Sequence, residues 1–238
     1  MIFGRGLVAN AVKAINSNGL IFYANGISNS VLNQIDKNNF EIKELEEIAT
    51  EHPDQLLVYF STCQVNSPIN HSRPYVRHKL FVEEFIANHF AHYLIVRTSN
   101  LVGYNPWNGH TLFNYLHHAL AVNQPILVNP FLIRNFLDVD HFVLLLGAYL
   151  NHCEKNKVVQ IVNPESYPMQ QVIDQFEKFF CKKFVLTTIN EGNDFAFFDL
   201  NTELSVELMG KSTVHFKDHI TELLKKYYSG DSKLHFRP

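Results

Sequence analysis

Three side chains have the types and spacing of a proton-transfer site. Thr62 follows the apolar run Leu56–Ser61, which is typical of a strand, and Tyr75 and Lys79 stand four residues apart in a segment with helical spacing. Residues four apart share one helix face, so the Lys79 ammonium is expected to stabilise a Tyr75 phenolate and to lower the pKa of Tyr75. Thr62 would hydrogen-bond the substrate oxygen that gains or loses the proton. The alternative is that Tyr75 packs and Lys79 snorkels to solvent.

A glycine-rich turn stands at the start of the sequence. It reads Gly-Arg-Gly-Leu-Val-Ala over residues 4–9, between an expected strand and an expected helix. The first glycine allows a tight turn, and the second allows a pyrophosphate to approach the backbone. This pattern predicts a dinucleotide site, in which Arg5 meets a phosphate or stacks on adenine. The residues expected there are Gly4, Arg5, Gly6, Leu7 and Val8.

The elements that must position these residues alternate between short strands and amphipathic helices. Strands are predicted over Met1–Phe3, Leu20–Ala24, Leu56–Ser61, Tyr93–Arg97, Val158–Val162 and Phe184–Thr188. Helices are predicted over Leu7–Ile15, Glu41–His52, Tyr75–His89, Thr111–Val122, His141–His152, Met169–Phe180 and Phe216–Tyr228. This alternation predicts an α/β fold with a doubly wound parallel sheet, whose ligands bind beyond the carboxyl ends of the strands.

Composition excludes several other classes of protein. The 238 residues are 46% hydrophobic and 18% charged with a net charge of −3, which favours no nucleic-acid or membrane partner. The longest apolar run, Phe142–Leu150, is too short to span a bilayer, and no signal peptide is recognised. Three scattered cysteines fit a reducing, cytoplasmic location. The 13 histidines show no metal-binding spacing, so no metal is expected.

Seven segments, in order along nearly the whole chain, resemble the extended short-chain dehydrogenase/reductase family, and in particular its NAD(P)-dependent nucleotide-sugar epimerases and reductases. The segments are FGRGLVANA, FYANGISNS, VYFSTCQV, PYVRHKLFVEEFI, LIVRTSNLVGYN, IRNFLDVDHFV and VQIVNPESYPMQQVIDQF. The resemblance implies NAD or NADP as cofactor and a nucleotide-diphosphate sugar as substrate.

The resemblance also assigns roles to individual residues. Thr62, Tyr75 and Lys79 match the family's catalytic residues, and Lys79 would also hold the nicotinamide ribose. Asn100 and Arg134 match residues that contact the nucleotide-sugar substrate, as Thr62 does. The remaining residues implied to lie beside the cofactor are Ala24, Asn25, Gly26 and Ser61. Read without the resemblance, Asn25-Gly26 is a plain turn.

The sequence departs from the family in its early strands. Leu20–Ala24 already matches the family's later "AAG" strand, so the family's second and third strands are missing. No Asp or Glu occurs between Met1 and Ile35, where the family places the acidic residue that binds the adenosine ribose. Only 12 residues separate Thr62 from Tyr75, about half the usual number, as in some members that make surface-polysaccharide sugars.

The residues after Thr62 bear on the reaction. The family's 4,6-dehydratases carry Asp-Glu there, whereas this chain has Cys63 and Gln64. Neither is a strong carboxylic acid or base, which favours an epimerase or reductase. The alternative is a degenerate protein of the same fold that binds a ligand or partner without catalysis.

The expected organisation is a shortened Rossmann core over residues 1–104, followed by a mixed region over 105–238 that completes the sheet and forms the substrate-binding part. A homodimer is expected because relatives pair the two matching helices. The apolar residues beyond one helical stripe are Phe81, Phe85, Leu116 and Leu120; deeper burial in the monomer is the alternative.

Overall fold

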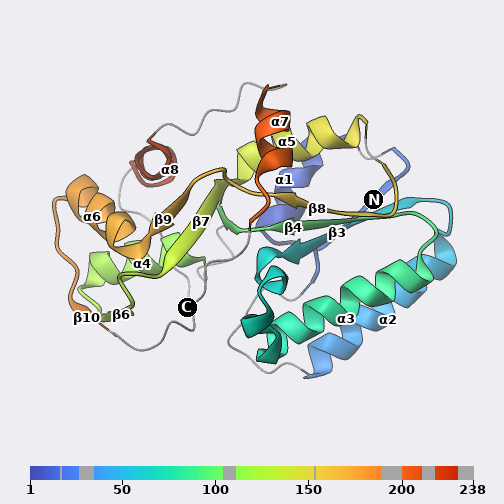
Figure 1. Cartoon of the computed structure of the whole chain (residues 1–238), viewed down its shortest axis with the longest axis horizontal. Coiled ribbons are helices and arrows are strands. Elements are labelled where there is room, and N and C mark those ends of the chain that lie inside the picture. The colour runs from blue at the N-terminus through green and yellow to red at the C-terminus, as the bar shows by residue number, and fades with distance from the viewer. Residues whose placement is uncertain are drawn as a thin grey trace.

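A five-stranded parallel sheet organises the larger lobe of the computed structural model (Figure 1). The structure describes residues 1–16, 18–26, 35–103, 111–152, 154–188, 200–210 and 218–229, without the side chains of 35–38. The strand order is β1-β2-β3-β4-β8, and all neighbours are parallel. The strands are β1 (Ile2–Phe3), β2 (Leu20–Tyr23), β3 (Leu56–Thr62), β4 (Tyr93–Thr98) and β8 (Lys157–Ile161).

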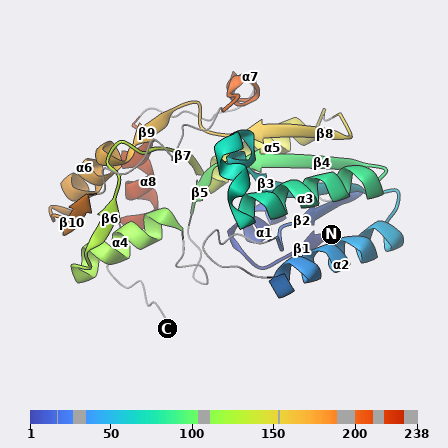
Figure 2. The ribbon, with the colours of Figure 1, turned by 60° about the horizontal axis from the view of Figure 1, so that its bottom comes forward.

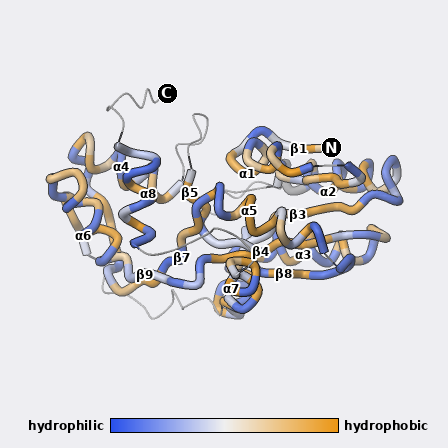
Figure 3. The backbone as a smooth tube through the Cα atoms, turned by 90° about the horizontal axis from the view of Figure 1, so that it is seen from above, coloured by the Kyte–Doolittle hydropathy of each residue, from blue (hydrophilic) through white to orange (hydrophobic). Residues whose placement is uncertain are grey.

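Helices cover both faces of this sheet. On one face lie α1 (Leu7–Ala11, continued by a 3₁₀ turn over Val12–Ala14), α5 (Val139–Leu150) and α7 (Glu203–Gly210). On the other face lie α2 (Ile35–Glu51) and α3 (Pro74–His89). Strand side chains alternate accordingly, with Phe22 and Val58 in the core beside α1 and α5, and Ile21 and Leu57 in the core beside α2 and α3. β3 is buried along its whole length and strongly hydrophobic (Figure 3).

The connection from β1 to β2 differs in hand from the next two connections. β1–α1–β2, β2–α2–β3 and β3–α3–β4 each step one strand across the sheet in the same direction. However, α1 packs beside α5, whereas α2 and α3 pack together on the opposite face. Equal steps with helices on opposite faces have opposite hands. The β1–α1–β2 connection therefore has the opposite hand to the β2–α2–β3 and β3–α3–β4 connections.

The smaller lobe has its own core. A three-stranded sheet contains β5 (Asn100–Val102), β7 (Ile133–Asp138) and β9 (Ser166–Pro168), and a parallel pair contains β6 (Ile126–Val128) and β10 (Leu186–Thr188). α4 (Leu112–Val122), α6 (Met169–Phe180) and α8 (His219–Tyr228) gather around them (Figure 2). Ring contacts among Phe113, Phe136 and Phe176 lie at the centre.

The expected α/β fold with a parallel sheet is confirmed. β1 lies directly beside β2, as expected if the family's second and third strands are absent. Helix Met169–Phe180 is confirmed at both ends, whereas α2 begins six residues before the expected Glu41. The expected strand Phe184–Thr188 is present as β10, outside the main sheet. No strand or helix was predicted at β5, β6, β7, β9 or α7. Cys153, residues 216–217 and the expected boundary after residue 104 lie outside the described residues.

The helices expected at a dimer interface are mostly covered by the chain itself. Phe85, Leu116 and Leu120 are buried, whereas Phe81 is 54% exposed. Burial within one chain therefore accounts for three of these four apolar residues. In the part of the chain that the structure describes, no helix combines the length and the apolar character needed to cross a membrane.

Candidate active site at the carboxyl edge of the main sheet

Thr62 and Tyr75 meet at the carboxyl end of β3. Thr62 is the last residue of the strand, and its hydroxyl accepts a hydrogen bond from the Gln64 backbone N–H at 3.2 Å. Two 3₁₀ turns then carry the chain to α3, which begins at Pro74. The Tyr75 side chain lies near that of Thr62, and this contact favours the ionised form of the phenol. Burial raises the pKa of Tyr75 to about 12, although the contact with Thr62 opposes this shift. Tyr75 is therefore a protonated phenol at neutral pH.

Lys79 lies one turn along α3, but its ammonium contacts other groups. It donates to the Tyr59 hydroxyl at 2.7 Å and to the Phe60 carbonyl at 3.5 Å, and it lies 3.8 Å from a Glu41 carboxylate oxygen. Burial lowers the pKa of Lys79 although the charge of Glu41 opposes this shift, so the tuning of Tyr75 by Lys79 stays a prediction. Glu41 from the adjacent α2 and Tyr59 from β3 supply the partners that hold Lys79 instead.

Glu41 is the centre of a buried network. Its carboxylate accepts from the Tyr59 hydroxyl at 2.9 Å and contacts the His78 ring Nε2 at 2.8 Å, and its residue is 1% exposed. Burial alone would raise the pKa of Glu41, but the charge of Lys79, followed by the hydrogen bond to His78, lowers it to about 2. Glu41 was not among the residues predicted at the site. The feature that could have predicted it is a carboxylate four residues before Leu45, on the stripe of α2 that faces the sheet.

The two glycines of the N-terminal turn have different structural roles. Gly4 has φ +115°, and a Cβ there would lie 2.4 Å from the Ala24 carbonyl oxygen, so glycine is required where β1 passes the end of β2. Gly6 caps α1, and a Cβ there would meet nothing within 4 Å. Space therefore remains beside the turn for a bound phosphate. Arg5 is exposed, Leu7 is buried and Val8 is half-buried.

The turn after β2 lies directly over the Glu41 network. Gly26 approaches so closely that a Cβ would lie 2.7 Å from both the Glu41 carboxylate and the Lys79 ammonium. Asn25 donates its side-chain amide to Glu44 at 2.9 Å. The structure therefore brings the expected cofactor turn and Lys79 together.

The Ser61 side chain is hydrogen-bonded to a residue of α3. Its hydroxyl donates to Glu83 at 2.5 Å, and the Arg97 guanidinium donates to both oxygens of the same carboxylate, at 3.1 and 2.6 Å. These contacts tie β3 and β4 to α3. They orient the Ser61 hydroxyl toward Glu83 and not toward the glycine turn.

The two residues expected to hold the substrate come from the smaller lobe's sheet. Asn100 on β5 donates its amide to the Asn135 carbonyl at 2.9 Å, which joins β5 to β7. Arg134 lies on β7, and its Nε is buried without a hydrogen-bond partner among the described residues. Burial, and then the nearby Arg73, lower the pKa of Arg134. Two guanidinium groups near one another form a surrounding that suits an anion.

Further buried polar atoms without a described partner lie near the same edge. They are Gln64 Oε1, two residues after Thr62, and Ser99 Oγ, directly after Thr98. Thr62 and Thr98 are register partners in β3 and β4, so both atoms follow neighbouring strand ends. Native proteins leave few such groups unsatisfied, so water or a polar ligand is expected to pair with these two atoms.

Cys63 and Gln64 remain poor candidates for acid–base chemistry. Burial raises the pKa of the Cys63 thiol to about 12, and the thiol faces Gln160 Oε1 at 3.9 Å. The described residues contain no group of three or more His, Cys, Asp or Glu side chains placed to hold a metal.

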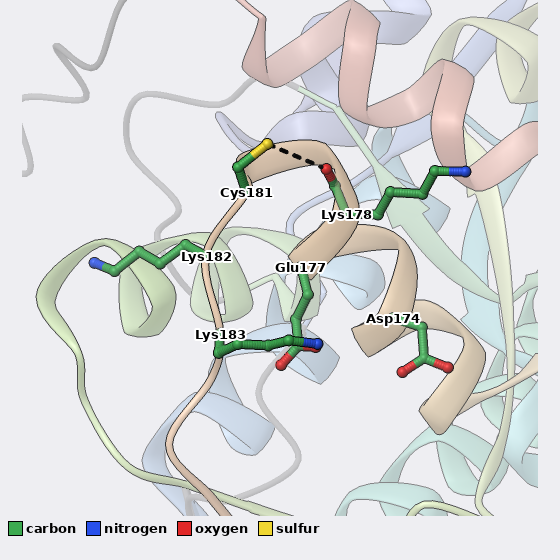
Figure 4. Close-up of a pocket in the computed structure, with 6 residues that line it drawn as sticks. All are labelled: Asp174, Glu177, Lys178, Cys181, Lys182 and Lys183. Atoms are coloured by element: carbon green, nitrogen blue, oxygen red, sulfur yellow. Dashed lines mark hydrogen bonds and ion pairs between the residues drawn. The ribbon is translucent and has the colours of Figure 1, made fainter.

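A hollow lined by charged residues lies elsewhere, at the C-terminal end of α6 in the smaller lobe (Figure 4). Its carboxylate Glu177 is paired with Lys183, and the Cys181 thiol faces the Lys178 carbonyl at 3.8 Å. None of the residues expected at the active site lines it.

No family model matches the sequence, and no curated protein matches it. Solved structures do match. An NAD-dependent NDP-hexosamine 5,6-dehydratase of tunicamycin biosynthesis, TunA, has a TM-score of 0.69 at 19% identity, over 93% of this chain and 82% of that one. The UDP-glucose 4-epimerase of Thermotoga maritima, with UDP-glucose, has a TM-score of 0.67 at 16% identity, over 89% of this chain and 77% of that one.

A third structure is the UDP-glucuronic acid 4-epimerase of Bacillus cereus in complex with NAD. It has a TM-score of 0.64 at 17% identity, over 95% of this chain and 79% of that one. At such identities the likeness shows the fold. The chain therefore has the Rossmann-like fold of extended short-chain dehydrogenases/reductases, as its sequence motifs predicted.

Proposed function

We propose that this protein is an NAD(P)-dependent nucleotide-sugar epimerase or reductase. The observation that carries the proposal is the placement of Thr62 and Tyr75 at the carboxyl edge of a parallel sheet that begins with an open glycine turn. The fold is shared with enzymes whose structures contain NAD or UDP-glucose, which supports the same ligand classes here.

Each site residue has a role in this proposal, and that of Lys79 is to hold the nicotinamide ribose and to tune Tyr75. Gly4 and Gly6 shape the turn that holds the pyrophosphate, and Arg5, Leu7, Val8, Ala24, Asn25, Gly26 and Ser61 border the cofactor. The nicotinamide supplies or accepts a hydride at a sugar carbon. Tyr75 moves the proton on the attached oxygen, which Thr62 orients. Arg134 binds the diphosphate through its forked donors, and Asn100 lies beside the sugar nucleotide.

Substitution of Tyr75 by Phe tests this function. The variant should lose turnover of nucleotide sugars with NAD(P) by a factor of about 100 or more, because it lacks the transferable proton. Its far-ultraviolet circular dichroism should stay unchanged. Tyr115, 40% exposed on α4, provides the matched control, and Tyr115→Phe should keep full activity. Full activity of Tyr75→Phe would end the proposed mechanism.

The binding of Lys79 by Glu41 and Tyr59 favours a second candidate, a protein of this fold that binds its ligand without catalysis. The two candidates differ in a simple measurement. Both predict that nucleotide sugars raise the melting temperature, but only the enzyme predicts that NAD(P) does so as well and is turned over.

A further inference from the structure

The stretch of chain that joins Thr62 to Tyr75 is a compact unit. Residues 63–73, called here the connecting segment, consist of two 3₁₀ turns and the residues beside them. Backbone hydrogen bonds run along the segment, and the Asn70 side-chain amide donates to the Gln64 carbonyl at 3.3 Å. A contact that fixes one point of this unit therefore restrains the rest of it.

Arg97 on β4 binds both the connecting segment and α3. Its Nη1 donates to Asn66 Oδ1 in the segment at 2.9 Å. Its Nε and Nη2 donate to the two carboxylate oxygens of Glu83 on α3, at 3.1 and 2.6 Å. The Arg97 and Glu83 side chains are only 23% and 7% exposed, so water competes little for these bonds. A guanidinium has five N–H donors in one rigid plane, so it holds two partners in fixed directions at once.

Glu83 extends this restraint to the residues of the site. It lies about two turns beyond Tyr75, on the helix face that Tyr75 and Lys79 share. Its carboxylate also accepts from the hydroxyl of Ser61 at 2.5 Å, and Ser61 directly precedes Thr62. These bonds fix both the rotation of α3 and its position along the carboxyl end of β3.

We propose that Arg97 is a positioning residue for Thr62 and Tyr75: its guanidinium fixes the segment that leaves Thr62 and, at the same time, the helix that carries Tyr75. The proposal rests on the function given above. Proton transfer requires the two hydroxyls to converge on one substrate oxygen, and a displacement of about 1 Å can lower a rate by a factor of about 100. Arg97 acts through Asn66 and Glu83 and not on the reacting atoms.

Hydrogen exchange of the backbone amides tests this restraint without cofactor or substrate. Asn66→Ala removes the bond from Arg97 to the connecting segment and leaves Glu83 paired. Amides of the segment should then exchange about ten times faster or more, while those of β3 and β4 stay unchanged. Asn88→Ala is the matched control, since Asn88 is exposed in the last turn of α3, and it should change neither set.

A conservative variant separates this bond from other effects of the Asn66 side chain. Asn66→Asp keeps an acceptor oxygen for Arg97, so its segment should exchange as in the parent protein. The proposal is overturned by unchanged exchange in Asn66→Ala, by faster exchange along the whole chain, or by an equal acceleration in Asn66→Asp.

If Asn66→Ala does not fold, Arg97→Lys decides instead. Lysine keeps a charge beside Glu83 but lacks the planar fork that reaches both partners. Acceleration confined to the connecting segment supports the proposal, and unchanged exchange refutes it. Arg77→Lys, at an exposed position of α3, is the control and should behave as the parent protein does.

Turnover tests the consequence for the reaction, with NAD and UDP-glucose as the probes. Asn66→Ala should lower kcat by a factor of about 10 or more and keep KM within a factor of about 3, because the ligands still bind while the two hydroxyls are misplaced. Full kcat together with faster exchange in the segment would remove the positioning role. If the parent protein shows no turnover, the proposed function has failed, and the exchange result alone decides whether Arg97 holds the segment.

Discussion

At the scale of single residues, the N-terminal turn separates a structural glycine from a functional one. Gly4 has a left-handed backbone, and its missing Cβ makes room for the Ala24 carbonyl. Gly6 has an extended backbone with open space around it. The same motif therefore contains one position where the fold requires glycine and one where it does not.

Gly4→Ala should lower the free energy of unfolding by about 2 kcal/mol or more, through backbone strain and the 2.4 Å approach to Ala24. Gly6→Ala should stay within about 1 kcal/mol of the parent protein, and it should weaken binding of NAD(P). Urea unfolding measures the first effect and calorimetric titration the second. Equal stability of the two variants would contradict this assignment.

The Thr62–Tyr75 pair could be predicted because both residues lie in strongly patterned segments, a buried strand and an amphipathic helix. The partner of Lys79 could not. Spacing along α3 relates Tyr75 to Lys79, but only the packing of α2 against α3 places Glu41 beside that ammonium. Local periodicity contains no information on which helices become neighbours.

At the scale of elements, α8 is joined to β7 and to the start of α5. Lys226 and Tyr227 both bind the buried carboxylate of Asp138, each at 2.7 Å. His219 lies at the other end of the helix, where its ring Nε2–H donates to the Phe136 carbonyl at 3.0 Å. These contacts attach α8 where the two lobes meet.

His219 should make stability depend on pH. Burial lowers its pKa from 6.5 to about 4, although the hydrogen bond to Phe136 opposes the shift. Between these values the unfolded chain binds a proton that the folded chain does not, so stability is lost as the pH falls. The expected loss from about pH 7 to about pH 5 is roughly 2 kcal/mol.

His219→Gln keeps an N–H donor for Phe136 but does not titrate, so this variant should lose that part of the pH dependence in urea unfolding. His152 is exposed at the end of α5, and His152→Gln serves as the control. Glu41, whose pKa is lowered to about 2, contributes mainly below its free value of 4.5, outside this range. The same slope in all three proteins would refute the role of His219.

Apart from α7, which covers the main sheet, the elements that the sequence failed to predict are strands of the smaller lobe. β5, β6 and β9 have three residues each, too few to show alternation above chance. β7 is longer, but it reads Ile-Arg-Asn-Phe-Leu-Asp, and its Asn135 and Asp138 are buried because other parts of the chain satisfy them. Tertiary hydrogen bonds thus override the polarity that argues against a strand.

At the scale of the whole molecule, β1 forms an edge of the main sheet. The sequence has no acidic residue between Met1 and Ile35 to bind an adenosine ribose. The glycine turn directly follows β1, and Thr62 ends β3, so both lie at the carboxyl ends of the parallel strands. We therefore predict that this chain binds the nicotinamide half of a dinucleotide more than the adenosine half.

Calorimetric titration should accordingly give similar dissociation constants for NADH and for reduced nicotinamide mononucleotide, within a factor of about 10, or about 1.4 kcal/mol. A longer protein with this fold, the Thermotoga maritima epimerase, is the comparison and should strongly prefer the dinucleotide. Much tighter binding of NADH by this chain would show that the adenosine half is held after all.

The reversed β1–α1–β2 unit also bears on how the short sheet arose. In a longer sheet, α1 would lead by the common right-handed path to a strand on the far side of β1. Without the strands on the far side of β1, α1 stays on the same face of the sheet. The chain must then reach β2 by a crossover of the opposite hand. A sheet assembled short from the outset would have placed α1 beside α2 and α3. The face on which α1 lies is therefore the face that a longer sheet with the missing strands would give it.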